Sequence, residues 1–114
     1  MTEPVIDPST FAELQQAAGA EFVAELVATF LEEAPPMLAE LRSAQATQAA
    51  QAADAFRRAA HSLKSNSLTF GASRLGAMAR QLELGGLIAD TAALDALETE
   101  YQQVAAALTE LCRG

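Results

Sequence analysis

Apolar side chains recur at helical spacing along the last part of the chain, and this periodicity sets the class of fold. From residue 94 to residue 111 they are separated by alternating steps of three and four residues, which places them on one side of an α-helix. They are Leu94, Leu97, Tyr101, Val104, Leu108 and Leu111. Alanine, the strongest helix former, occurs 27 times among the 114 residues. The chain is therefore predicted to be all-α.

The start of the chain carries the signals of a short first helix. Asp7 is placed to cap it, and Pro8 suits its first position because an N–H would be unpaired there anyway. Ile6 and Phe11 stand where they would pack together across the helix start, and Gly19 ends the pattern. We expect this helix to pack as a cover over longer ones.

Three further helical segments precede the last one. The first of these is expected from about residue 20 to 47, and Pro35–Pro36 predicts a kink or a break near Ala34. The next runs from about residue 54, or a few residues earlier, to residue 70. The third begins near Ser73 and stops at Gly85–Gly86.

The connections between these segments are short. Gly71 ends the helix that precedes it, and Asp90 or Thr91 is expected to cap the last helix. A turn must lie within residues 45–53, although no glycine or proline marks its place. Four longer helices with short connections predict an antiparallel up-down-up-down four-helix bundle, with the short N-terminal helix as a cover. With no internal repeat or linker, residues 1–114 are expected to form a single domain.

Composition excludes several classes of function. A formal net charge of −8 argues against general nucleic-acid binding, because a phosphate backbone would be repelled. No stretch approaches the roughly 18 apolar residues of a membrane span, and the acidic start has no apolar run typical of a signal peptide. The single Cys112 fits a reducing compartment. We therefore expect a soluble cytoplasmic protein.

The charge is unevenly distributed along the chain. Residues 1–53 sum to −7 and residues 81–114 to −5, whereas residues 54–80 sum to +4. Five of the seven basic residues lie in that central quarter, together with His61, the only histidine. The position of the charge therefore directs attention to one helix.

A helical wheel places His61 on the outer face of that helix. Five residues lie within about 40° of one line and form the expected core stripe: Phe56, Ala60, Leu63, Ser67 and Phe70. His61 lies about 140° from that line. Around it on the wheel lie Asp54, Arg57, Arg58, Lys64, Ser65 and Leu68. His61 is thus predicted to face outward.

An exposed imidazole among cations is suited to phosphoryl chemistry. The cations disfavour its protonated form and leave a neutral, nucleophilic ring nitrogen. They would also attract a dianionic phosphoryl group attached there, and Leu68 offers an apolar contact to a partner. The competing interpretation is a solvated surface histidine with no function.

The residues around His61 resemble a known signature. Ala60-His61-Ser62-Leu63-Lys64-Ser65-Asn66-Ser67, followed by Phe70-Gly71-Ala72 and Leu75, is similar to the motif of histidine-containing phosphotransfer (HPt) domains of bacterial multistep phosphorelays. The likeness extends in looser form to residues 30–35 upstream and 81–83 downstream, so it covers essentially the whole chain. The resemblance implies a helical phosphocarrier.

The resemblance also implies roles for individual residues. His61 would accept the phosphoryl group through Nε2, and Lys64 would sit beside that group and offset its charge. Ser65 takes a position where Gly is commoner, Gly71 is the turn glycine, and Glu83 falls where some members place a polar residue that hydrogen-bonds the imidazole. The expected partner-binding residues are Arg57, Arg58, Ser65, Leu68 and Gly71.

The implied partners are response-regulator receiver domains, a hybrid sensor histidine kinase, or both. Mg²⁺ and most catalytic groups would belong to the receiver, so we expect no cofactor and no metal site in this chain. The chain carries no Walker-type or other glycine-rich nucleotide motif, which predicts no autonomous kinase activity. We expect a monomeric phosphocarrier rather than an enzyme.

Two alternatives use the same histidine face. The chain could be a non-phosphorylated helical adaptor that binds a response regulator without transfer. It could instead be an enzyme with His61 as general base, although the sequence shows no second catalytic partner. The combination of His61, Lys64 and the small Ser65 favours the phosphocarrier.

Overall fold

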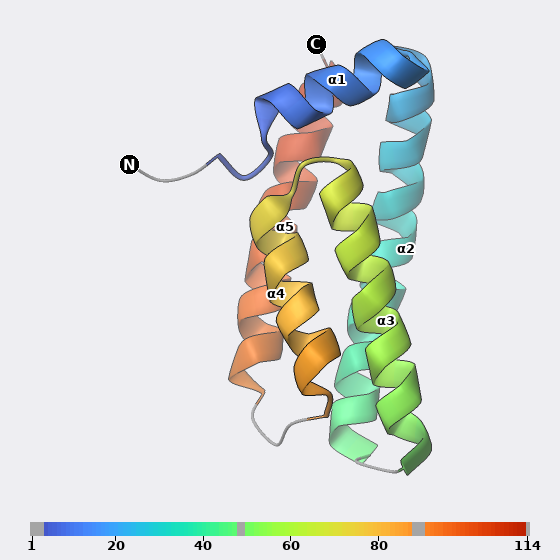
Figure 1. Ribbon diagram of the computed structural model, residues 1–114, viewed down its shortest axis with the longest axis vertical. Coiled ribbons are helices and arrows are strands. Elements are labelled where there is room, and N and C mark those ends of the chain that lie inside the picture. Colours follow the sequence, from blue (N-terminus) through green and yellow to red (C-terminus); the bar gives the residue numbers. More distant parts are fainter. Residues whose placement is uncertain (1–3, 48–49, 88–90, 114) are drawn as a thin grey trace.

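The computed structural model describes residues 4–47, 50–87 and 91–113, and all the regular structure in these ranges is helical (Figure 1). This confirms the all-α prediction. The helices are α1 (Pro8–Ala18), α2 (Ala20–Thr47), α3 (Ala50–Thr69), α4 (Ser73–Gly85) and α5 (Ala92–Arg113). None of the helices in the described ranges is long and apolar enough to span a membrane.

The four longer helices pack side by side. α3 packs against α2 and α4, and α5 also packs against α2 and α4. The four longer helices lie lengthwise, with successive ones running in opposite directions, and α1 crosses over one end of them (Figure 1). α1 packs against α2.

The start of α1 forms as predicted. One carboxylate oxygen of Asp7 accepts a hydrogen bond from the backbone N–H of Ser9 at 3.0 Å, and the other accepts from the Thr10 hydroxyl at 3.1 Å. Ile6 and Phe11 are both buried. The Asp7 N–H also donates to the carbonyl of Gly71 at 2.9 Å, so this cap is joined to the α3–α4 turn.

Burial confirms the predicted core stripe: all five residues are buried, four of them on α3 and Phe70 in the turn directly after it. On α5 the predicted stripe is buried as far as Leu108, but Leu111 is 42% exposed. The prediction for Leu111 is wrong because this residue lies in the last turn of α5, beyond the part of the helix that packs on the core. Phe30 of α2 packs in the same core. Its ring centroid lies 5.5 Å from that of Phe70 and 5.9 Å from that of Tyr101.

The helix α2 continues through both prolines, so of the kink or break expected near Ala34 the break is wrong. A proline inside a helix removes one backbone hydrogen bond and costs about 3 kcal/mol. Pro35 and Pro36 are both exposed, while the buried stripe of α2 continues from Ala34 to Leu38 on the opposite side. Burial of the residues before and after the prolines therefore keeps the helix continuous.

α3 begins at Ala50, four residues before Asp54, which agrees with the expected start at about residue 54 or a few residues earlier. A turn was expected within residues 45–53; α2 ends at Thr47 and α3 begins at Ala50, and residues 48–49 between them lie outside the described residues. At the start of α5, the carbonyl of Thr91 accepts from the N–H of Asp95 at 3.0 Å, whereas Asp90 lies outside the described residues.

An ion-pair network fastens α2 to α5. The Arg42 guanidinium donates to both carboxylate oxygens of Glu98, at 2.7 and 2.9 Å, and to Asp95 at 2.6 Å. These hydrogen bonds raise the pKa of Arg42 and lower that of Glu98. The contact of Arg42 with Glu98 is bidentate, the geometry in which an arginine–carboxylate ion pair is strongest.

Candidate functional site

His61 projects from the outer face of α3, as predicted. Its side chain is 57% exposed, whereas Ala60 and Leu63, which lie on the core side of the same helical turn, are fully buried. The helix therefore presents the imidazole to solvent because its apolar stripe holds the opposite side against the core.

Glu83 of α4 joins His61 to Lys64. Its Oε2 lies 2.7 Å from Nδ1 of His61, and its Oε1 lies 2.8 Å from Nζ of Lys64. The Glu83 and Lys64 side chains are only 19% and 22% exposed, so both are partly shielded beside the exposed ring. One carboxylate thus holds the two residues that stand one helical turn apart on α3.

The charge on Glu83 fixes the tautomer of the imidazole. The hydrogen bond from Lys64, followed by that from His61, lowers the pKa of the Glu83 carboxyl below its usual value. An ionised carboxylate can only accept hydrogen bonds, so Nδ1 carries the proton. The lone pair of the neutral ring is then on Nε2, for which no hydrogen-bond partner is found among the described residues.

The local sequence explains why these side chains meet. α3 and α4 are consecutive helices joined by a turn of three residues, 70–72. Gly71 sits in that turn with φ of 83°, a conformation that glycine adopts without the steric cost of a side chain. The tight turn lays α4 directly on α3, which brings Glu83 next to Lys64 and His61.

Leu68 extends the exposed face along α3 and rests on α4 at Gly76. It is 50% exposed. A Cβ added at Gly76 would lie 2.6 Å from Cδ2 and 2.9 Å from Cγ of Leu68, so the absence of a side chain there makes room for the leucine. Sequence reasoning missed Gly76, and the available signal was a glycine inside a helix.

The remaining predicted site residues divide into two groups. Arg57, Arg58 and Ser65 are exposed on α3, and Arg57 Nη1 lies 3.6 Å from Asp54 Oδ1. Gly71 is buried beneath Asp7 and Thr10, so the structure does not bring it to the histidine face. Its place is in the turn that closes α3.

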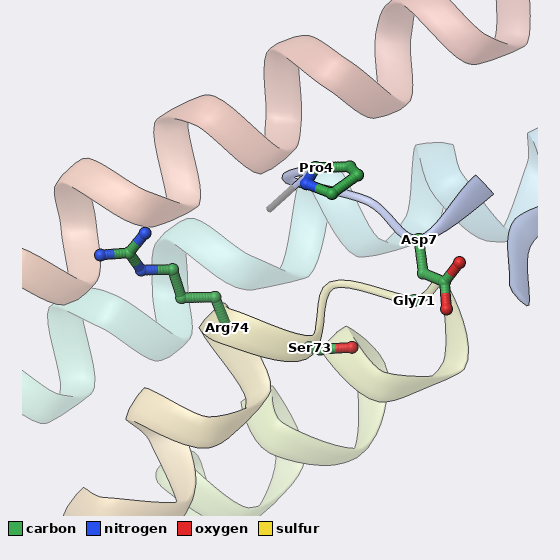
Figure 2. Close-up of a pocket in the computed structure, with 5 residues that line it drawn as sticks. All are labelled: Pro4, Asp7, Gly71, Ser73 and Arg74. Carbon is green, nitrogen blue, oxygen red and sulfur yellow. The ribbon is translucent and has the colours of Figure 1, made fainter. Parts of the chain in front are cut away.

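A separate hollow lies near the start of α4, between Pro4, Asp7, Gly71, Ser73 and Arg74. Figure 2 shows the guanidinium of Arg74 pointing away from Asp7 and Ser73. Arg74 Nε is 3.8 Å from Glu100 Oε1 on α5. The polar groups of this hollow do not converge, and His61 is not among its lining residues.

Metal ligation has no support in the side-chain arrangement that the structure describes. Within residues 4–47, 50–87 and 91–113, no three His, Cys, Asp or Glu side chains gather as they would around a metal ion. The groups in contact at this site are the His61 imidazole, the Glu83 carboxylate and the Lys64 ammonium, with Glu83 touching both of the others.

The fold and site together define an all-helical protein with an exposed histidine on its surface, whose Nδ1 is held by a carboxylate. The family model described as the Hpt domain matches residues 25–107. The chain belongs to the Hpt domain family, whose members are phosphocarriers rather than enzymes. No curated protein and no solved structure matches the chain at a significant level.

Proposed function

We propose that this protein carries a phosphoryl group on Nε2 of His61 between receiver-domain aspartates of a multistep phosphorelay. The observation that carries the proposal is the contact of Nδ1 with Glu83 at 2.7 Å, which leaves Nε2 as the exposed nucleophile. In this proposal α2–α5 form the antiparallel up-down-up-down bundle, α1 covers its end, and the protein acts as a monomer in the cytoplasm.

The proposed step is a reversible in-line displacement. The lone pair on Nε2 attacks the phosphorus of an aspartyl phosphate, the N–P bond forms, and the P–O bond breaks to release the carboxylate. The imidazole becomes cationic and keeps its proton on Nδ1, where Glu83 accepts the hydrogen bond. Because the transition state is loose, positioning and charge stabilisation contribute most of the rate, and the receiver with its Mg²⁺ supplies most of both.

Lys64 has two possible partners in this cycle. In the unphosphorylated protein its Nζ is paired with Glu83 at 2.8 Å. Because it stands one turn from His61 on the same helix, it can offer a hydrogen bond and a positive charge to the phosphoryl group once that group is attached. We propose that Lys64 first holds Glu83 and then offsets the charge of the phosphoryl group.

The surface around His61 is the proposed receiver contact. Leu68 supplies an exposed apolar side chain, and Ser65 is small enough to admit a close partner. Arg57 and Arg58 add positive charge on an otherwise acidic protein, which would steer an acidic partner to this face. All of these residues lie on α3.

Incubation with a phosphorylated receiver tests the proposal. The protein should acquire phosphate that is labile in acid and stable in base, as expected for phosphohistidine. His61→Gln should acquire none while keeping its helical circular dichroism, and ATP alone should label neither protein. Receiver binding without label would favour the adaptor alternative, and label on the His61→Gln variant would contradict the assignment of the site.

A further inference from the structure

The four longer helices form two layers of opposite charge. α3 packs with α4 and α2 packs with α5, and Figure 1 shows the first pair in front of the second. α3 and α4 carry two acidic and five basic residues, a net charge of +3. α2 and α5 carry nine acidic and two basic residues, a net charge of −7. The layer that does not carry His61 therefore attracts cationic groups.

A groove runs along this acidic layer between α2 and α5. It consists of two hollows that meet at Arg42, with volumes of about 580 and 460 Å³. The apolar residues that line the first are Pro35, Leu38, Ala39 and Tyr101, and those that line the second are Ala46 and Leu94. From residue 35 to residue 46 the two hollows extend about 16 Å along α2, which is three helical turns. We call this surface the α2–α5 groove.

The charged residues of the α2–α5 groove leave it negative. Arg42 crosses the groove and donates hydrogen bonds to Glu98 and Asp95, so two carboxylates surround one guanidinium. Glu32 is exposed on α2, one turn before Pro35, and adds a negative charge toward the other end. The groove thus combines an apolar lining with acidic borders.

Tyr101 brings a hydroxyl without a partner to the α2–α5 groove. The residue is only 8% exposed, and within the described ranges its hydroxyl makes no hydrogen bond. Every fully buried polar side-chain atom in those ranges has a partner, so this hydroxyl is not enclosed by the core and opens to the groove that Tyr101 lines. Tyrosine hydroxyls in buried positions usually have a hydrogen-bond partner. A molecule bound in the groove would supply one.

We propose that the α2–α5 groove binds a basic amphipathic helix of a partner protein. A groove three turns long accepts apolar side chains spaced at i, i+3 or i+4, and i+7 on such a helix. Lysine and arginine side chains beside them would meet the acidic borders. Two copies of this chain joined through the groove would instead place two layers of −7 against each other. The inference goes beyond the proposed function and does not depend on it, because the groove and His61 belong to different layers.

A labelled model peptide tests the groove on the full chain. The probe is a helix of about 14 residues, roughly four turns, with leucine on one face and lysine elsewhere. A second peptide carries glutamate in place of every lysine. Fluorescence anisotropy measures the affinity of each peptide, and backbone amide shifts in NMR spectra locate it. The lysine peptide should bind roughly 10-fold or more tightly than the glutamate peptide, lose affinity as salt is added, and shift signals of α2 and α5.

Three variants separate the groove from the rest of the surface. Ala39→Arg places a long cationic side chain in the groove and should weaken binding of the lysine peptide roughly 10-fold or more. Ala77→Arg is the matched control and should bind as wild type does, because Ala77 is exposed on α4 in the other layer. Tyr101→Phe removes only the hydroxyl and should weaken binding roughly 2- to 10-fold.

Several outcomes would overturn the inference. These are equal affinities for the two peptides, equal affinities of wild type and Ala39→Arg, and amide shifts confined to α3 and α4. A sedimenting dimer that Ala39→Arg dissociates would assign the groove to a second copy and overturn it as well. Labelling of His61 by phosphoramidate, a small-molecule phosphoryl donor, should proceed equally with the lysine peptide bound. Absence of labelling with and without peptide would count against the proposed function alone.

Discussion

Leu68 of α3 lies across Gly76 of α4 so closely that a methyl group at Gly76 would fall 2.6 Å from Cδ2 of the leucine. The glycine thus sets how an exposed apolar side chain lies on the histidine face. This contact couples the packing of two helices to the shape of the surface that we propose for receiver binding.

Gly76→Ala is expected to displace Leu68 and weaken receiver binding. Transfer from a phosphorylated receiver should slow roughly 3- to 10-fold, equivalent to about 0.7 to 1.4 kcal/mol, while labelling by phosphoramidate stays the same. Gly85→Ala is the control, since a Cβ there meets nothing within 4 Å. Equal receiver kinetics in both variants would show that the position of Leu68 does not matter.

Lys64→Ala is expected to slow transfer without unfolding the protein. The substitution removes the partner of Glu83 Oε1 at 2.8 Å and a positive charge near the phosphoryl group. A hydrogen bond to a charged group contributes about 1.5 to 3 kcal/mol, so transfer should slow roughly 10- to 150-fold. Rapid-quench transfer kinetics measure the rate, and circular dichroism should show unchanged helicity. Lys64→Arg should retain part of the rate, and a loss of helix in Lys64→Ala would instead indicate a structural role.

Gly71→Ala is expected to destabilise the fold at the α3–α4 turn. The residue has φ of 83°, and an added Cβ would lie 3.0 Å from Cβ of Thr10 and 3.1 Å from the carbonyl oxygen of Asp7. A non-glycine residue in this left-handed conformation costs about 1 to 2 kcal/mol before any such contact is counted. Thermal unfolding should therefore occur at lower temperature than in wild type. An unchanged unfolding temperature would mean that the turn adapts without cost.

The contribution of Glu83 to the free energy of unfolding is expected to decrease as the pH falls. Its pKa in the folded protein is lowered by Lys64 and then by His61. A group of this kind stabilises the fold fully above its ordinary pKa, and the contribution disappears as the pH falls through the lowered folded value. Urea unfolding of wild type and Glu83→Gln from pH 7 to pH 3 should show a difference that shrinks on acidification. A difference that stays constant or grows would contradict this linkage.

The sequence was sufficient to predict the orientation of α3. Its buried stripe, including Phe56 and Leu63, follows directly from helical periodicity, and the outward direction of His61 follows from the same wheel. The alternative of a break near Ala34 was wrong because the backbone preference of Pro35 and Pro36 was outweighed by burial of the helix before and after them.

The details of the site needed the structure. A wheel gives the direction of a side chain from its own helix, but not the residue that meets it from a neighbouring helix. Glu83 stands 22 residues from His61, and only the packing of α4 on α3 shows that it contacts both His61 and Lys64. Likewise the pairing of Leu68 with Gly76 depends on the register of the two helices.

The tight turn around Gly71 has a consequence for how relatives of this site can vary in length. His61 and Lys64 lie on α3 and Glu83 lies on α4. The length of the connection, residues 70–72, therefore sets how the three side chains are placed relative to one another. One residue inserted into α4 before Glu83 would rotate its carboxylate by about 100° and move it about 1.5 Å along the helix axis. Insertions between α2 and α3 or between α4 and α5 would leave this hairpin intact. Loop length is thus constrained at one end of the protein and free to change at the other.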